Sequence, residues 1–410
     1  MPKIHFIDVT NRDTVQASRI SLAKLQKTLL NMYLAEMGVH QSEFAFPFTR
    51  HEQNYVRANL ELQQLGAMGN LILEGWCRAV VEDVAASLPT GVKDLNISIS
   101  TSDQMITYKF KGRLNREKII QEMVEAAKYA RKEGVRTLGV NAEDASRTDI
   151  GYLVEFAQAA KEAGADRIRY CDTIGCETPM SIYERTKTLA EQARVDIELH
   201  CHNDLGMAVA NSVAGAQGVL DAGFDAYINT SVNGLGERAG QADLLSCILA
   251  LHFAKGMENY QIGDNINLKV AAKLATYASY AFGVPIPINQ PGVGANAFAH
   301  ESGIHADGAL KNRRNYELYD FELIGLEYGI SQDPLPSGRV ITTGEYGGLA
   351  GFKYVYSRLG IEFQDEEQAG KILELVRYAN AHTQLPLTDD ELRLIAAHPE
   401  QVRQVLTVTP

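Results

Sequence analysis

Short runs of β-type residues alternate with helix-type segments along about the first 255 residues of the chain. The runs that predict strands are Ile4–Val9, Gln41–Phe46, Leu71–Cys77, Leu95–Ser100, Thr137–Asn141, Arg167–Asp172, Ile197–His202 and Ala226–Thr230. Apolar spacing between them predicts helices, one marked by Leu22, Leu25 and Leu29, another by Ile120, Met123, Val124 and Ala127 and stopped by Gly134. Eight such units are typical of a (β/α)8 TIM barrel. A doubly wound open sheet has the same order of elements, but ligands bind at the carboxyl ends of the strands in both folds.

The pattern changes after about Lys255. A helical segment around 271–281 is followed by VPIPINQPGVGANAF, whose Pro and Gly residues are typical of an ordered linker. The tail from Gly348 looks small and helical. We expect a barrel over residues 1–258, a helical linker subdomain over 259–320 and a small helical C-terminal subdomain over 321–410.

Composition narrows the class of partner. The formal net charge of −12 disfavours nucleic acid and anionic membranes, and no run of eighteen apolar residues predicts a membrane span. The start, MPKIHFIDVT, lacks the pattern of a secretory signal, and the five cysteines are scattered without zinc-ribbon spacing. We therefore expect a cytoplasmic protein with free thiols that acts on small molecules.

The stretch IELHCHND places polar side chains on one face of the seventh strand. Residues two apart leave a strand on the same side, so Glu198, His200 and His202 point together. The first strand ends in DVTNRD, which adds Arg12 and Asp13 at the same end of the sheet. A histidine pair alone is more often a hydrogen-bonded core pair. A carboxylate and two imidazoles at strand ends, however, suit a catalytic divalent ion with open positions.

Other strand ends carry further polar groups. Asn96 shares a face of the fourth strand with two serines, which suits a ligand cavity if that face is inward. After the fifth strand, helix capping explains Asp144 or Ser146 but not Glu143. An inward arginine at position 169 needs an anion, either a substrate carboxylate or a barrel acid.

Six motifs occur together in order over residues 1 to about 350: DVTNRDTVQ, EDASRTD, DTIG, HCHND, GLGERAGQ and FAHESGIHADG. Their combination resembles the acyl-CoA-condensing barrel enzymes, namely the isopropylmalate, homocitrate, citramalate and Re-face citrate synthases. Through IDVTNRD, LNISISTSDQM and RIRYCDT the chain most resembles the Re-face citrate synthases.

The resemblance implies a set of site residues. Asp13, His200 and His202 would hold a divalent ion (Mn, Mg, Co or Zn), and Arg12 would polarise the keto oxygen of the substrate. Gln16 and Thr173 would line the oxo-acid pocket, with Asn96 and Arg169 as further substrate contacts and Glu143 near the thioester. His305 would reach in from a neighbouring subunit of a homodimer with swapped C-terminal subdomains, while Glu43 and Tyr316 are weaker assignments.

Several positions depart from the family pattern. Asn11, Thr14 and Val15 replace Leu, Gly and Glu of the first motif, and Asn96 replaces a common histidine. Gln241 stands where the family has an asparagine that can complete the metal shell, and its side chain is one methylene longer. These changes surround the oxo-acid pocket, so they affect substrate identity more than reaction type.

The expected activity is a metal-dependent Claisen condensation of acetyl-CoA with an α-keto dicarboxylic acid, with oxaloacetate giving citrate and CoA. Homocitrate synthase, with 2-oxoglutarate as acceptor, or another 2-alkylmalate synthase is the alternative within the family. An acyl-CoA lyase or aldolase, and a non-catalytic metal-binding scaffold, are the alternatives from other classes. The cysteine-bearing GLGGCPY-type loop of the lyases is replaced here by GLGERAG.

Overall fold

Eight parallel strands close into a barrel in which each strand pairs with the next and β8 returns to β1. The strands are β1 (Ile4–Asp8), β2 (Gln41–Ala45), β3 (Ile72–Arg78), β4 (Asp94–Ser100), β5 (Thr137–Glu143), β6 (Arg167–Asp172), β7 (Asp196–Cys201) and β8 (Ala226–Thr230). The predicted TIM barrel is confirmed, and closure between β1 and β8 excludes the doubly wound sheet, which has free edges.

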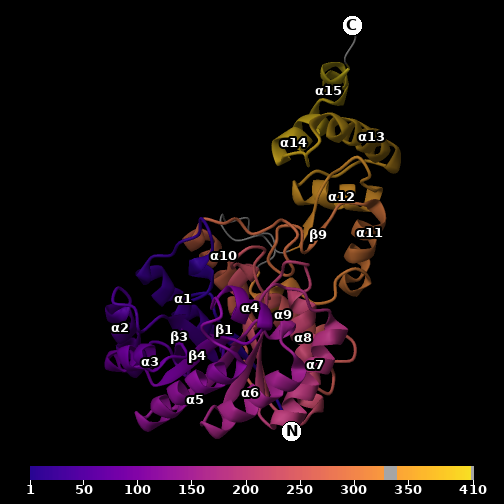
Figure 1. Ribbon diagram of the computed structural model, residues 1–410. Helices are drawn as coiled ribbons and strands as arrows, with labels where there is room; N and C mark the ends of the chain where they lie inside the picture. The colour runs from indigo at the N-terminus through magenta and orange to yellow at the C-terminus, as the bar shows by residue number, and fades with distance from the viewer. Residues whose placement is uncertain (327–338, 408–410) are drawn as a thin grey trace. The chain divides into compact units, whose positions relative to one another are not determined.

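The computed structural model describes residues 1–326 and 339–407, and it divides into two units, Met1–Ile286 and Pro287–Pro410 (Figure 1). The division falls inside the Pro- and Gly-rich stretch that the sequence marks as a linker. It comes later than the expected boundary at 258/259, because the helix after that boundary packs on the barrel unit. The three-part division stays a prediction, and part of its last segment lies outside the described residues.

Helices surround the barrel in the first unit (Figure 1). They are α1 (Lys24–Met37), α2 (Gln53–Gln64), α3 (Val81–Ser87), α4 (Asp103–Tyr108), α5 (Arg116–Lys132), α6 (Ile150–Glu162), α7 (Pro179–Ala193), α8 (Ala208–Asp221), α9 (Leu244–Phe253) and α10 (Ala271–Phe282). Side-chain caps begin several of them: Asn115 accepts from Lys118 N, and Asp149 accepts from Tyr152 N. Asp149 therefore caps α6, the helix after the fifth strand, rather than Asp144 or Ser146.

The predicted apolar stripe of α1 is wrong. Leu25 is 80% exposed, and the buried face instead carries Leu30 and Leu34 together with Lys27 and Asn31. Lys27 is buried because its ammonium pairs with Glu52 at 2.8 Å. The spacing of apolar residues along the sequence does not reveal this buried face of α1, because half of the face is polar. In α5 the prediction is better, since Met123 and Ala127 are buried.

An ionic network fills the lower layers of the barrel. Arg169, which is fully buried, donates from Nε to Glu198 at 2.6 Å and from Nη2 to Glu43 at 2.5 Å. Arg167 donates to Glu198 at 2.7 Å and also bonds Glu74. Burial alone would raise the pKa of Glu198, but the two arginines lower it to about 2, whereas burial raises the pKa of Glu74 to about 7. These ion pairs explain why the sequence has polar residues at the inward-facing positions of the strands.

The second unit is small and mostly helical. Its elements are β9 (Ala299–His300), α11 (Gly303–Lys311), β10 (Val340–Ile341), α12 (Leu349–Arg358), α13 (Glu366–Thr383), α14 (Asp389–Ala397) and α15 (Pro399–Leu406). An apolar core around Phe352, Tyr356 and Val376 joins α12 to α14. Within the described residues, every helix is too short or too polar to cross a membrane.

Candidate active site

Three side chains from two strand ends meet at the C-terminal end of the barrel. Asp13 follows β1 in a tight turn, with its N–H bonded to Val9 O at 2.8 Å, and His200 and His202 come from the end of β7. All three are buried, and one potential ligand atom from each lies within 4.8 Å of the others. His200 Nε2 is 3.3 Å from His202 Nε2 and 3.8 Å from Asp13 Oδ2.

The protonation states suit a cation. Burial lowers the pKa of His200 to about 3 and also lowers that of His202, so both imidazoles are neutral near pH 7. Burial raises the pKa of Asp13, but the positive charge of Arg12 leads the opposing effects, which leave this pKa below its usual value. The site therefore presents one carboxylate and two neutral rings, which is the form that binds a metal.

Asn229 sets the tautomer of His200. Its Nδ2 donates to Glu198 Oε1 at 2.6 Å, which leaves its Oδ1 facing His200 Nδ1 at 3.1 Å. Because an amide oxygen only accepts, the His200 proton sits on Nδ1 and the lone pair of Nε2 faces the cluster. An outer residue that orients a metal-ligating imidazole in this way is a regular feature of metal sites.

Gln241 borders the same cluster. Its Nε2 donates to Asp13 Oδ2, and its backbone bridges to His202. Its Oε1 is buried and bonds to none of the described residues. A buried oxygen without a hydrogen-bond partner costs free energy unless a cation or water satisfies it. The longer side chain fits because Gly236 lies against it, where a Cβ would come within 2.8 Å of the amide.

Arg12 joins the cluster to the ionic network below it. Its guanidinium donates to both Asp13 and Glu43, and its Cζ lies 5.5 Å from the centre of the Trp76 ring. Glu43 also accepts a hydrogen bond from Arg169, so one carboxylate pairs with both arginines. Arg12 is thus fixed beside the ligand cluster, where a developing negative charge on a substrate oxygen would meet it.

Asn96 and Arg169 both lie one layer below the histidines. Asn96 Nδ2 donates to Glu198 at 3.4 Å, and Arg169 bonds Glu198 and Glu43. The expectation that Arg169 binds a substrate carboxylate is not supported, because barrel acids already neutralise it and it is fully buried. The structure instead has the alternative that the sequence left open, a salt bridge inside the barrel.

Three further predicted residues lie at the strand ends on the side of the cluster: Glu143 is the last residue of β5, while Gln16 and Thr173 follow β1 and β6. Glu143 accepts from Lys109 Nζ at 2.6 Å and from Ser100 Oγ at 2.5 Å. Thr173 Oγ1 accepts from Asp144 N at 2.9 Å, while Gln16 is exposed. Their expected roles toward substrate stay predictions.

Two departures from the family motifs make specific contacts. Asn11 Nδ2 donates to Asn31 Oδ1 and to Lys27 O, both at 2.8 Å, and this accounts for the polar face of α1. Thr14 Oγ1 donates to Leu235 O at 2.7 Å, which ties the loop after β1 to the loop after β8. Both side chains therefore anchor the loop after β1, which carries Arg12 and Asp13, to neighbouring elements.

His305 lies on α11 of the second unit and is exposed. Its ring stacks on Tyr316 with centroids 4.2 Å apart and planes 24° apart. His300 lies beside both rings and is bonded to Glu317 at 3.2 Å, which is in turn held by Arg339. The resemblance gave Tyr316 only as a weaker assignment, and the structure places it against His305.

Two residues that bond predicted site residues were missed from the sequence. Lys109 directly follows α4 and bonds Glu143, and Asn229 lies on β8 as a single amide in an otherwise ordinary strand. Asn229 is the fourth residue of β8, and its side chain points into the barrel. A polar residue there, opposite the end of β7, is the signal that strand alternation could have used.

Comparison with known proteins agrees with this geometry. Residues 3–277 match the HMGL-like family, and residues 293–384 match the family of homocitrate synthase post-HMGL domain-like regions. The chain is 55% identical to a citrate (Re)-synthase of Dehalococcoides mccartyi over 100% of its own length and 99% of the relative's. It is 39% identical to 2-isopropylmalate synthase 2 of Caldanaerobacter subterraneus (95% and 94% covered) and 34% identical to homocitrate synthase AksA of Methanocaldococcus jannaschii (91% and 86%).

Among solved structures, hydroxymethylglutaryl-CoA lyase from Pseudomonas aeruginosa superposes with a TM-score of 0.57 at 17% identity, covering 70% of this chain and 95% of the lyase. At that identity the likeness shows the fold alone. The family match over most of the barrel and the full-length relatives show the family as well as the fold. The chain belongs to the HMGL-like family and carries the homocitrate synthase post-HMGL domain-like region after its barrel.

Proposed function

We propose that this protein is a citrate synthase that condenses acetyl-CoA with oxaloacetate to give citrate and CoA. The observation that carries the proposal is 55% identity to a citrate (Re)-synthase along the full chain, combined with the buried Asp13, His200 and His202 cluster beside Arg12. Relatives named as isopropylmalate and homocitrate synthases are 39% and 34% identical.

The donor set fits a divalent cation from the group Mn, Mg, Co and Zn, held by Asp13, His200 and His202 with Gln241 Oε1 free to join them. Such an ion supplies Lewis-acid polarisation of the keto acid. The chain's own residues supply the rest. Asn229 orients His200, Glu43 fixes the guanidinium of Arg12, and Arg12 stabilises the negative charge that grows on the keto oxygen.

The bond changes follow from the products. A base takes a proton from the methyl group of acetyl-CoA, and the resulting carbon nucleophile forms a bond to the keto carbon. The keto oxygen gains a proton and becomes the hydroxyl of the citryl thioester. Water then cleaves the thioester and releases the CoA thiol. We assign the base to His305, whose stacking on Tyr316 holds its ring in place.

We further propose that His305 acts in a homodimer with swapped C-terminal subdomains, on the barrel of the partner subunit, and that the enzyme works in the cytoplasm. The dimer is tested by mixing two inactive variants, Asp13→Ala and His305→Ala, unfolding them together and refolding the mixture. If the active site combines two chains, mixed dimers recover part of the activity. Mixtures that stay as inactive as either parent contradict a shared site.

The acceptor is tested with purified enzyme, acetyl-CoA and a panel of keto acids: oxaloacetate, 2-oxoglutarate, 2-oxoisovalerate and pyruvate. Release of CoA thiol is followed, and each product is identified by mass spectrometry. We expect the highest kcat/KM with oxaloacetate and citrate as product. A pocket discriminates one methylene by only about 1–3 kcal/mol, so weak turnover of 2-oxoglutarate is compatible with the proposal.

Other outcomes assign other functions. A preference for 2-oxoglutarate makes the protein a homocitrate synthase, and a preference for 2-oxoisovalerate makes it an isopropylmalate synthase. Cleavage of hydroxyacyl-CoA thioesters without condensation indicates a lyase. Metal binding without any turnover would make the protein a non-catalytic metal-binding scaffold. The face of attack, which we propose to be Re by similarity to the relative, is assigned by degrading citrate made from labelled acetyl-CoA with a stereospecific lyase.

A further inference from the structure

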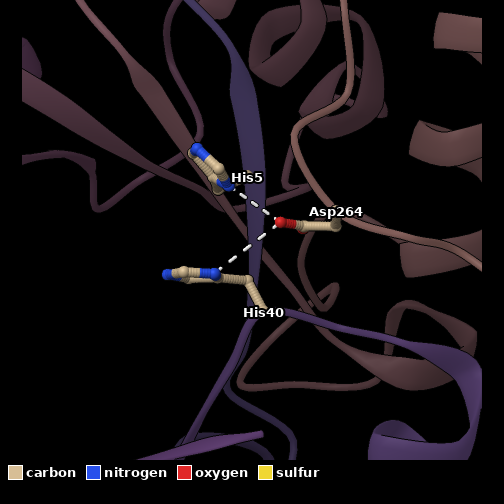
Figure 2. A group of neighbouring side chains, drawn as sticks. All are labelled: His5, His40 and Asp264. Atoms are coloured by element: carbon tan, nitrogen blue, oxygen red, sulfur yellow. Dashed lines mark hydrogen bonds and ion pairs between the residues drawn. The ribbon is translucent and has the colours of Figure 1, made fainter. Parts of the chain in front are cut away.

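A second group of two histidines and an aspartate lies at the opposite, N-terminal end of the barrel. His5 is the second residue of β1, His40 precedes β2, and Asp264 lies in the segment between α9 and α10. Figure 2 shows both imidazoles turned toward the same carboxylate oxygen. Asp264 Oδ1 is 2.8 Å from His5 Nδ1 and 3.7 Å from His40 Nδ1, and these three atoms lie within 4.8 Å of one another.

The backbone holds Asp264 in this position. The segment around it runs beside the start of β1: Ile4 N donates to Gln261 O at 2.9 Å, and Gly263 N donates to Ile4 O at 2.7 Å. The other carboxylate oxygen, Oδ2, accepts from Phe6 N at 2.8 Å. Oδ1 therefore faces the two rings while Oδ2 is fixed by the strand.

Two glycines allow the three segments to approach. A Cβ on Gly263 would come within 2.2 Å of the His5 ring, so any larger residue there would displace that ring. Gly38 ends α1 with φ of 82°, and a Cβ there would lie 2.2 Å from Asn265 O. This close packing places Asn265, the residue after Asp264, against Gly38 in the turn that leads to His40.

The group is open on one side. His40 and Asp264 line a cavity of about 520 Å³, which also receives Glu36, Asn70 and Asn265. The side chains of His5 and Asp264 are only 15% and 2% exposed, whereas that of His40 is 31% exposed. A small ion with its waters can reach the carboxylate oxygen from the cavity, while the ring of His5 stays behind it.

We propose that His5, His40 and Asp264 bind a divalent first-row cation of the zinc class, separate from the catalytic centre. Neutral imidazole nitrogens and one carboxylate oxygen are the ligands that zinc and cobalt take, with water in the remaining position. Ligand atoms of a tetrahedral ion with bonds of about 2.0–2.2 Å lie roughly 3.4 Å apart, between the two distances observed.

The ion would tie three distant parts of the chain. β1, the turn before β2 and the segment after α9 contribute one ligand each, so binding favours the closed barrel over the unfolded chain. The nearby guanidinium of Arg167 does not oppose this, because Glu74 and Glu198 neutralise it inside the barrel. The N-terminal face of a TIM barrel usually serves stability, which agrees with a structural ion.

The test counts metal ions in the full-length protein. Protein stripped with a chelator is titrated with Co²⁺, and binding is followed by calorimetry and by the visible spectrum, which reports nitrogen and oxygen ligation. The C-end variant, Asp13→Ala with His202→Ala, removes two of the three ligands of the catalytic cluster. His40→Gln removes the most exposed ligand of the N-terminal group, and His252→Gln, an exposed histidine on α9, is the matched control.

Wild type should bind two ions, the C-end variant one, and the C-end variant with His40→Gln none. His252→Gln should change neither number. Zn²⁺ should raise the Tm of the C-end variant by several degrees and should not raise it once His40→Gln is added. A C-end variant that binds no Co²⁺, or one whose single ion survives His40→Gln, overturns the proposal and leaves the three residues as a hydrogen-bonded tie.

Discussion

The two ends of the barrel each bring an aspartate and two histidines together, yet they build the group in different ways. At the C-terminal end Asp13, His200 and His202 are all buried, and an amide behind them fixes one ring. At the N-terminal end the histidines are partly exposed, and backbone hydrogen bonds fix the aspartate instead. The same donor types can therefore serve different purposes, because the surroundings decide which atoms are oriented and what can reach them.

Burial makes the electrostatic difference. At the C-terminal end desolvation lowers the pKa of His200 to about 3, so the ring is neutral near pH 7. That end also carries Glu143 at the end of β5 and Arg12 and Thr173 in the loops after β1 and β6, as expected for the functional face of a barrel. Polar groups also lie at the N-terminal ends of the strands, but they bond one another: Asp94 at the start of β4 accepts from Arg136 and Thr137, for example.

The largest effect should separate the two ends by activity. His202→Ala removes one of the three proposed metal ligands, and loss of an outer partner of a ligand alone costs about 10–100-fold, so kcat/KM should fall by more than about 100-fold. His40→Gln should leave kcat/KM unchanged at saturating metal. Steady-state kinetics with acetyl-CoA and oxaloacetate measures both. Equal losses in the two variants would show that the ends are coupled and that the comparison is mistaken.

The next effect concerns the amide behind His200. Asn229→Ala removes the acceptor that holds the Nδ1 proton, so metal affinity at the C-terminal end should fall by about 10–100-fold. Activity should return at high metal concentration, because the ligands themselves remain. Titration of activity against metal concentration checks this. A loss of kcat that excess metal does not restore would mean that Asn229 does more than orient the ring.

A smaller effect tests the packing of the N-terminal end. Gly38→Ala places a Cβ against Asn265 O at a positive φ, so the free energy of unfolding should fall by about 1–3 kcal/mol from strain and more from the clash. Gly66→Ala is the matched control, since its φ is 84° but nothing lies within 4 Å of its Cβ. Urea denaturation of both variants separates the two terms. Equal losses would show that the approach of the 261–267 segment contributes nothing.

The smallest effect lies on β1, whose start carries His5 and whose end carries Asp8. Burial raises the pKa of Asp8 from 3.8 to about 7, so the folded protein holds this proton more tightly than the unfolded chain. The stabilisation is present below about pH 4 and is lost as the pH rises through about 7. Asp8→Asn cannot ionise, so its stability relative to wild type should rise over that range, by at most a few kcal/mol. A difference independent of pH, measured by urea denaturation, would contradict this.

Much of the fold could be predicted because the strands are regular. Inward faces alternate with outward faces, so spacing alone put Glu198, His200 and His202 on one side, and each predicted strand overlaps the observed one within two residues at either end. The helix predicted around Leu25 and Leu29 is present as α1, but its buried face differs from the predicted one. That face contains Lys27 and Asn31, which are stable there only through partners in other elements. Residue type does not reveal such partners.

The sequence by itself determined the order of the barrel units, the end at which polar side chains gather and the identity of the ligand candidates at that end. Only the tertiary structure decided that Arg169 pairs with barrel acids, that Asn229 orients His200, and that residues 5, 40 and 264 meet. Periodicity along a chain fixes the direction of a side chain, and strand direction fixes the end of the barrel where it lies. Which charge it meets across the barrel depends on closure, register and the path of the connecting segments, and these join residues whose separation along the chain follows no repeat.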